Sequence, residues 1–228
     1  MSDSVVHGAA DRDSSAPWGG KLAHFRLAEE GLRFVIPLAL ATILAGLLLP
    51  GPAWALLLAP TLATAAFFRD PCRIPPEDDS LIVAPADGRV LQVESGPDGS
   101  RIAVFLSVFD CHVNRAVTAG RVTAVDYRPG RFLPAWDKRC TAENEQTVID
   151  LDTPRGPVRI VQIAGLIARR IVTYVGPDVS IERGQRIGMI RFGSRTELTL
   201  PAGVVVRSKV GDYVWGGETV VAQWSIPL

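Results

Sequence analysis

Lysine, histidine and cysteine are all scarce in this chain, and the scarcity of cysteine and histidine argues against disulfide and metal sites. The 228 residues contain only three of each: Lys21, Lys138, Lys209, His7, His24, His112, Cys72, Cys111 and Cys140. The cysteines are odd in number and widely spaced, with no CxxC pair. This pattern disfavours a disulfide framework or a zinc site and favours a reducing compartment. No cluster of three or four convergent ligands is apparent, so we expect no metal.

A net charge is also missing, because 24 basic residues balance 24 acidic ones. A neutral chain offers no electrostatic attraction to a polyanion, so we expect no nucleic-acid partner. The length allows one sizeable core, or a core with an appendage.

Residues 1–20 lack hydrophobic periodicity and are rich in Gly, Ser and Ala, which predicts a mobile tail. No apolar run follows a basic start there, so a signal peptide is not expected. Residues 21–33 differ, because apolar side chains recur at helical spacing and predict an N-terminal amphipathic helix. These side chains are Leu22, Phe25, Ala28 and Leu32.

Charge is absent from Phe34 to Phe68, a run far longer than soluble cores usually need. The "PGP" at 50–52 divides it into two pieces of roughly 16 residues, each about 24 Å long as a helix against a bilayer core of about 30 Å. Arg33 precedes the run and Arg69 follows it, which favours two cytoplasmic ends. We therefore expect residues 21–70 to form a membrane-associating segment with an apolar helical hairpin, at the cytoplasmic face of the cell membrane. The alternative is a buried hairpin packed on the domain.

After residue 75 the chain consists of short Val- and Ile-rich runs separated by Gly, Pro and Asp, which predicts one mainly β domain over 75–228. Two phrases inside it echo each other, "VSIERGQRIGMI" (179–190) and "SKVGDYVWGGETVVAQW" (208–224). Their rhythm resembles lipoyl and biotinyl carrier domains, so we expect a compact domain with lipoyl or barrel-sandwich-like hairpins. Carriers present a modified lysine at a hairpin tip. Here the tip reads "IRFGSRT" and presents Ser194 instead.

The Gly193–Ser194 pair can be a simple turn, as most such pairs are, but it also permits a reaction. A serine hydroxyl can attack the carbonyl before it, and a preceding glycine leaves that carbonyl open and allows unusual backbone angles. The resulting ester can undergo β-elimination, which cuts the chain and leaves a pyruvoyl group after ammonia is lost. Such a carbonyl condenses with amines and accepts electrons from a breaking bond.

Several stretches around this pair resemble the phosphatidylserine decarboxylase proenzymes, in the short form of bacteria and archaea. They stand in the right order over roughly residues 30–228: "FFRDPCRIPP", "APADGRV", "SVFDCHVNRA", "ENE", "QIAGLIARRIV" and "IRFGSRTELTLP". The resemblance implies self-cleavage between Gly193 and Ser194, a large chain of residues 1–193 and a small chain of residues 194–228. It also implies a covalent pyruvoyl cofactor made from Ser194.

The resemblance also assigns roles to three further residues. Asp87, which alone would be read as an Asx-turn aspartate, is expected to orient a histidine for cleavage. His112, otherwise a buried hydrogen-bonded histidine, is expected to act as base and proton donor. Arg115 stands where longer bacterial enzymes carry a second histidine, and it cannot act as a base. It could pair with Asp87 or bind the carboxylate or phosphate of the substrate.

The implied function is decarboxylation of phosphatidylserine to phosphatidylethanolamine and CO2 by a membrane-bound enzyme with a phospholipid substrate. Two alternatives stay open at this stage. One is a membrane-tethered, lipoyl-like adaptor without catalysis, and the other is a pyruvoyl decarboxylase of another amino-acid substrate. An adaptor would remain one chain, whereas the enzyme would split into two.

Overall fold

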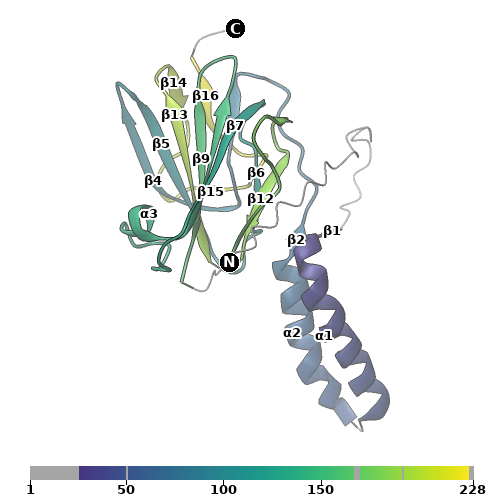
Figure 1. Ribbon diagram of the computed structural model, residues 1–228. Coiled ribbons are helices and arrows are strands. Elements are labelled where there is room, and N and C mark those ends of the chain that lie inside the picture. Colours follow the sequence, from purple (N-terminus) through teal and green to yellow (C-terminus); the bar gives the residue numbers. More distant parts are fainter. Residues whose placement is uncertain (1–25, 50, 167–169, 192, 226–228) are drawn as a thin grey trace. The chain divides into compact units, whose positions relative to one another are not determined.

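The computed structural model describes residues 26–49, 51–166, 170–191 and 193–225, shown in Figure 1. The chain falls into two compact units, one within residues 21–72 and one that begins at Arg73. The expected mobile tail, residues 1–20, lies outside the described residues.

The first unit is a helical hairpin. Its elements are β1 (Arg26–Leu27), α1 (Glu29–Leu48), the 3-10 helix η1 (Gly51–Trp54), α2 (Ala55–Phe67) and β2 (Arg69–Asp70). The expected break at "PGP" is confirmed, since η1 separates the two helices. By length and composition, α1 is apolar enough to cross a membrane, and α2 is a shorter apolar helix.

The helix predicted over 21–33 is present only from Glu29 onward among the described residues. Arg26 and Leu27 form a strand that pairs with Asp70 and Arg69, and α1 begins only at Glu29. The physical reason is a long-range pairing that local periodicity cannot reveal. The N–H of Ala28 donates to the Phe68 carbonyl at 2.8 Å, which closes the base of the hairpin before the helix starts.

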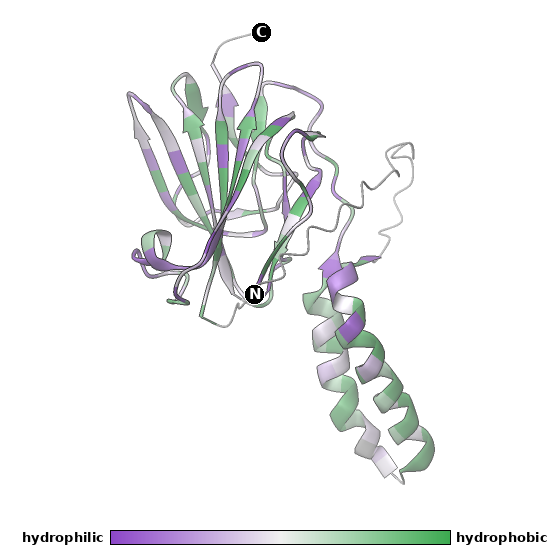
Figure 2. Cartoon of the chain, in the orientation of Figure 1, coloured by the Kyte–Doolittle hydropathy of each residue, from purple (hydrophilic) through white to green (hydrophobic). Residues whose placement is uncertain are grey.

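Small and hydroxyl-bearing side chains join the two helices. Thr42 and Thr61 are buried, and their Oγ1 atoms lie 2.9 Å apart. Gly31 lies so close to Phe68 that a Cβ on it would approach the Phe68 Cβ to 2.5 Å. Small residues and Thr–Thr hydrogen bonds are typical of helix contacts inside membranes. Most of the large apolar side chains remain exposed, including Leu47 at 77%, and both helices are largely green in Figure 2.

The second unit is built from antiparallel sheets (Figure 1), which confirms the mainly β prediction. The largest sheet contains, in spatial order, β11 (Ser180–Ile181), β7 (Gly120–Arg128), β8 (Gln146–Asp152), β9 (Val158–Ala164), β13 (Ser194–Pro201), β5 (Gly99–Leu106), β4 (Gly88–Gly96) and β15 (Tyr213–Val214). Two three-stranded sheets complete the unit. They are β10 (Ile171–Thr173), β12 (Arg186–Ile190) and β6 (Val113–Arg115), and β14 (Val204–Val206), β16 (Val220–Trp224) and β3 (Leu81–Val83). The short helix α3 (Cys140–Glu143) precedes β8.

The two similar sequence segments, 179–190 and 208–224, make equivalent connections between sheets in this unit. The first passes from β11 in the large sheet to β12 in a small sheet, and the second passes from β15 to β16 in the same way. Since β11 and β15 are the two ends of the large sheet, each phrase carries one edge of that sheet into a smaller one. The sheets of the described residues form a sandwich and no closed barrel.

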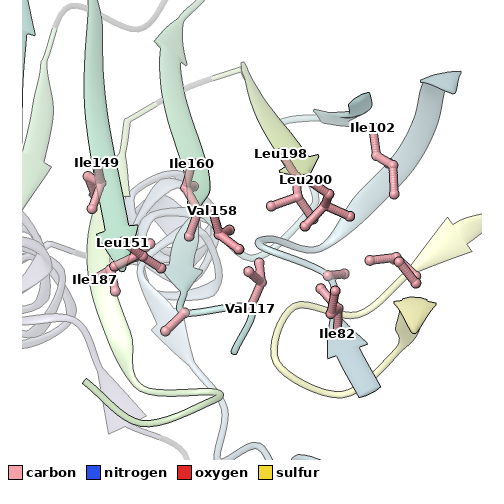
Figure 3. Close-up of a cluster of buried hydrophobic side chains, with 14 of the residues drawn as sticks. Ile82, Ile102, Val117, Ile149, Leu151, Val158, Ile160, Ile187, Leu198 and Leu200 are labelled. Atoms are coloured by element: carbon pink, nitrogen blue, oxygen red, sulfur yellow. The ribbon is translucent and has the colours of Figure 1, made fainter. Parts of the chain in front are cut away.

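The apolar core lies between the large sheet and the two small ones, as Figure 3 shows. Ile160, Leu198 and Leu200 come from the large sheet, whereas Ile82 and Ile187 come from the small sheets. Side chains two residues apart on a strand share a face. The core face of β13 therefore continues from Leu200 and Leu198 toward the first residues of the strand, where the candidate site lies.

Candidate active site

Ser194 is the first residue of the central strand β13 and has no solvent exposure. It pairs with Leu106 on β5 and with Ala164 on β9. Among the residues that the structure describes, its Oγ has no hydrogen-bond partner. Buried hydroxyl groups without a partner are rare and call for an explanation, and a catalytic role is one. The predicted position thus holds a hydroxyl that is buried from solvent and has no hydrogen-bond partner within the described residues.

The residue before it, Gly193, adopts a left-handed backbone conformation with φ +60°. This conformation favours glycine and separates the loop from the strand that starts at Ser194. The Gly193 carbonyl is pressed against Gly165, where a Cβ would lie 2.1 Å from the Gly193 oxygen and 3.0 Å from its carbonyl carbon. Only glycine at position 165 leaves room for this carbonyl, so Gly165 fixes the position of the peptide bond expected to break.

His112 contacts the same peptide segment. It is fully buried, and its Nε2 accepts a hydrogen bond from the Gly193 N–H at 3.2 Å. Its Nδ1 lies 2.9 Å from the main-chain oxygen of Asp110. A carbonyl oxygen can only accept, so Nδ1 carries the proton and Nε2 keeps its lone pair. This neutral tautomer directs its basic nitrogen at the glycine before Ser194.

The loop that holds His112 is itself well anchored. The Asp110 carboxylate accepts hydrogen bonds from the Ser107 N–H at 2.7 Å and from the Tyr213 hydroxyl at 2.6 Å. The main chain of Asp110 also closes a turn onto Ser107. The carbonyl that sets the His112 tautomer is therefore rigidly placed, as a group that orients a base should be.

Three polar side chains extend this site into the sandwich. Asn114, Gln162 and Thr196 are all fully buried, and Gln162 Nε2 donates to Asn114 Oδ1 at 2.7 Å. Thr196 pairs with Gln162 across the strands and shares a face of β13 with Ser194. Within the described part of the chain, Asn114 Nδ2, Gln162 Oε1 and Thr196 Oγ1 have no hydrogen-bond partner. The core face thus becomes polar as it approaches Ser194.

Asp87 makes long-range contacts rather than only a local turn. Its Oδ2 lies 2.6 Å from Arg73 Nη2, and its Oδ1 accepts a hydrogen bond from the Gly216 N–H at 2.7 Å. Burial acts to lower the pKa of Arg73, but Asp87 and Glu218 outweigh it, so the pKa is raised and the guanidinium stays charged. The relay from Asp87 to His112 stays a prediction.

Arg115 is buried on β6, and its Nη1 donates to the Gly184 carbonyl at 3.0 Å. Its aliphatic part lies against Gly217, where a Cβ would approach Arg115 Cδ to 2.8 Å. Alternation along β6 places its side chain on the face opposite Asn114. The predicted substrate-binding role of Arg115 has no support from these contacts and stays a prediction.

Replacing Gly165 with alanine is expected to slow any reaction at the Gly193 carbonyl. The new methyl group must displace main-chain atoms, and a misplacement of about 1 Å can cost about 10²-fold in rate. Chain cleavage over time on a gel measures the effect. The control is Gly96→Ala, which has no atom within 4 Å of the new Cβ. Cleavage of Gly165→Ala at the rate of this control would contradict the role of Gly165.

Replacing Asp87 with asparagine is expected to destabilise the fold, because it leaves the buried Arg73 guanidinium without its Asp87 partner. Because Arg73 keeps its ion pair with Glu218, the loss is expected to be about 1–3 kcal/mol. If Asp87 also orients His112, cleavage slows as well. Chemical denaturation gives the first quantity and gel analysis the second. Asp150→Asn, which removes an exposed pair with Arg159, is the control and should cost less than about 1 kcal/mol. An equal loss in both variants would contradict the importance of the buried pair.

Sequence reasoning missed Gly165, Asn114, Gln162 and Thr196. A signal was present for Gln162, which interrupts the Val- and Ile-rich strand β9, and for Gly165, which follows that strand directly. The strands β6 and β13 are themselves polar, so Asn114 and Thr196 do not stand out in them. What local patterns could not supply was the pairing of β9 with β13, which brings Gly165 against Gly193 and Gln162 beside Thr196.

A comparison with protein families now defines the class. Residues 61–222 match the model of the family described as phosphatidylserine decarboxylase. The match runs from α2 to β16 and covers well over half of the chain. The protein is therefore a decarboxylase by family, that is, a carboxy-lyase. It belongs to the phosphatidylserine decarboxylase family, which confirms the resemblance drawn from the motifs and disfavours a non-catalytic adaptor.

Proposed function

We propose that this chain is a proenzyme that cleaves itself between Gly193 and Ser194 and then decarboxylates phosphatidylserine to phosphatidylethanolamine and CO2. One observation carries the proposal: the buried Ser194 Oγ, which has no hydrogen-bond partner among the described residues, follows a left-handed Gly193 whose N–H is bound to His112. These are the groups that an acyl shift at a Gly-Ser bond requires.

The cleavage follows from the chemistry of these residues. Ser194 Oγ attacks the Gly193 carbonyl carbon, its proton passes to a base, and the Ser194 nitrogen leaves as an amine. Loss of the Ser194 α-proton then expels the Gly193 carboxylate and leaves a dehydrated N-terminal residue. Water replaces its nitrogen, which departs as ammonia. The base that we propose is His112, whose Nε2 lies beside this peptide segment and now accepts the Gly193 N–H.

The same site suits the pyruvoyl group that would form from Ser194, because the hydroxyl concerned has no structural hydrogen bond to lose. A pyruvoyl group supplies a carbonyl that binds the amine of the serine head group and takes up electrons as the bond to CO2 breaks. His112 Nε2 would hold the proton that replaces CO2. Asn114 and Thr196 would offer hydrogen bonds in a site buried from solvent, where the low dielectric constant strengthens such bonds.

The proposed lipid substrate gives the helical hairpin a purpose. Two acyl chains keep phosphatidylserine in the bilayer, so the enzyme must work at the membrane. The exposed apolar faces of α1 and α2 and the Thr42–Thr61 contact support an anchor. Arg33 and Arg69 at its two ends favour the cytoplasmic face.

Deletion of residues 1–70 is expected to weaken membrane association more than folding. The hairpin forms a compact unit of its own, and the core of the β unit comes from residues after Arg73. Co-sedimentation with phosphatidylserine vesicles measures the first effect, and thermal unfolding measures the second. An insoluble or unfolded β unit would instead show that the hairpin is part of the core.

Carbonyl reagents test the proposed chemistry. Phenylhydrazine should abolish the formation of phosphatidylethanolamine from phosphatidylserine vesicles and should add its mass to the small chain alone. Free serine serves as the comparison substrate and should react far more slowly. Full activity after treatment, without modification of the small chain, would rule out the pyruvoyl chemistry.

A further inference from the structure

Exposed apolar side chains gather around the end of the large sheet at which Ser194 begins β13. Four of the six are aromatic, and together they are called the aromatic rim: Val108, Phe109, Trp136, Leu166, Tyr213 and Trp215. Phe109 is 82% exposed and Trp136 is 66% exposed, so most of each side chain faces solvent. Single exposed apolar residues need no explanation, but a cluster marks an interaction surface.

Strand pairing explains why the first rim residues surround Ser194. Ser194 pairs with Leu106 at the end of β5 and with Ala164 at the end of β9. The chain leaves β5 directly into the Val108–Phe109 loop, and it leaves β9 into Leu166. Val108, Phe109 and Leu166 therefore lie just beyond the strand ends that adjoin Ser194.

Trp136 lies at the same end of the strands, and positively charged residues lie near it. Its ring meets Phe105 edge-on with centroids 6.1 Å apart, and Phe105 pairs with Arg195, the second residue of β13. Two exposed cationic residues lie in the adjoining segments, Lys138 beside Trp136 and Arg170 before β10. The surface thus combines apolar rings with cations, which complements anionic lipid head groups.

Tyr213 and Trp215 complete the rim. Their rings lie 5.0 Å apart, and the Tyr213 hydroxyl donates to the carboxylate of Asp110, whose carbonyl orients His112. Rings with one polar atom are the side chains that proteins place at the boundary between membrane and water. The rim is therefore linked to the catalytic histidine by two hydrogen bonds through one residue.

The opposite end of the large sheet has a different character. There the turns read "GPDG" at 96–99 and "DTPRG" at 152–156, which are short, polar and typical of solvated hairpins. Val205 is exposed near that end, after β13 has finished. The concentration of aromatic side chains at the Ser194 end is thus a property of that end and not of the whole domain.

We propose that the aromatic rim is a second membrane-contact surface, distinct from the helical hairpin, which inserts into the interface of a bilayer containing anionic lipid. The inference rests on the proposed function, because a lipid substrate requires Ser194 to reach the head-group layer. Contact through the rim would bring the head group to the site without extracting the acyl chains from the bilayer.

Site-specific fluorescence on the full chain tests the rim. The starting chain carries Cys72→Ser and Ser194→Ala and so retains only the buried Cys111 and Cys140. The substitution Phe109→Cys is added to it, and the new thiol is labelled with an environment-sensitive fluorophore. The matched control carries it at Val205→Cys. Vesicles of phosphatidylcholine and phosphatidylserine should shift the emission at 109 to the blue, and a quencher attached to lipid should act at 109 but not at 205. No change at 109, or equal changes at both positions, would overturn the proposal.

A kinetic comparison separates the rim from the chemistry. The rate of decarboxylation is measured on vesicles and on monomeric short-chain phosphatidylserine. Phe109→Ser and Trp136→Ser should each lower the ratio of the first rate to the second by roughly tenfold, because burial of one aromatic side chain changes a binding constant by about that factor. Val205→Ser is the control. An unchanged ratio would overturn the rim as a docking surface. If no chain decarboxylates either substrate, the proposed function fails, while the fluorescence result still decides on the rim.

Discussion

A chain with Ser194→Ala is expected to remain in one piece and to have no decarboxylase activity. The substitution removes the Oγ that starts the acyl shift and the atoms that would become the pyruvoyl group. Because this Oγ has no hydrogen-bond partner among the described residues, its loss leaves no buried group newly unsatisfied. The fold should therefore keep its stability while processing stops completely. A gel and a phosphatidylethanolamine assay measure the two effects.

Ser100→Ala is the matched control for this experiment. Ser100 is also buried in the large sheet, but it pairs with Leu200, far along β13 from Ser194. Its replacement should leave cleavage intact. Complete processing of the Ser194→Ala chain would end the account of this site, whatever the activity.

The second large effect is expected for His112→Ala. His112 is the one histidine among the described residues, and its Nε2 is bound to the Gly193 N–H. Losing a general acid–base group typically costs about 10²- to 10⁴-fold in rate. Cleavage happens once and can still finish slowly, whereas decarboxylation must turn over. We therefore expect slow processing and a loss of about 10²-fold or more in turnover for each processed chain.

Two measurements keep this result interpretable. Band splitting over time gives the cleavage rate, and phosphatidylethanolamine formed per cleaved chain gives turnover independently of how much has been processed. His24→Ala, in a part of the chain outside the described residues, is the control and should show neither defect. Normal cleavage together with normal turnover in His112→Ala would remove this residue from the mechanism.

The sequence predicted an apolar helical segment and a mainly β part, because both can be recognised from local composition. An uncharged run from Phe34 to Phe68 and β-branched runs after residue 75 are signals that a local window can detect. The break between α1 and α2 was predicted for the same reason, since two prolines flank a glycine there. The helix expected over 21–33 begins only at Glu29, because Arg26 and Leu27 pair with residues more than 40 positions away.

The candidate site also contains residues that local motifs reveal and residues that they do not. Ser194, Gly193 and His112 could be named from motifs, and the structure brings His112 into contact with Gly193. The steric slot at Gly165 and the anchoring of Asp110 by Tyr213 depend on contacts between strands that are distant in sequence. Such contacts follow from the register of the whole sandwich, which no single segment encodes.

The central claim, self-cleavage at Gly193–Ser194, is tested most directly by the intact mass of the purified protein. The account predicts two chains in place of one of 24.5 kDa: a large chain that ends at Gly193, and a small chain that begins at position 194. The small chain should be lighter by one ammonia than a peptide starting with an unmodified Ser194, and Edman sequencing should find no N-terminus on it. A single uncut chain, or a small chain that begins with intact serine, would contradict the account.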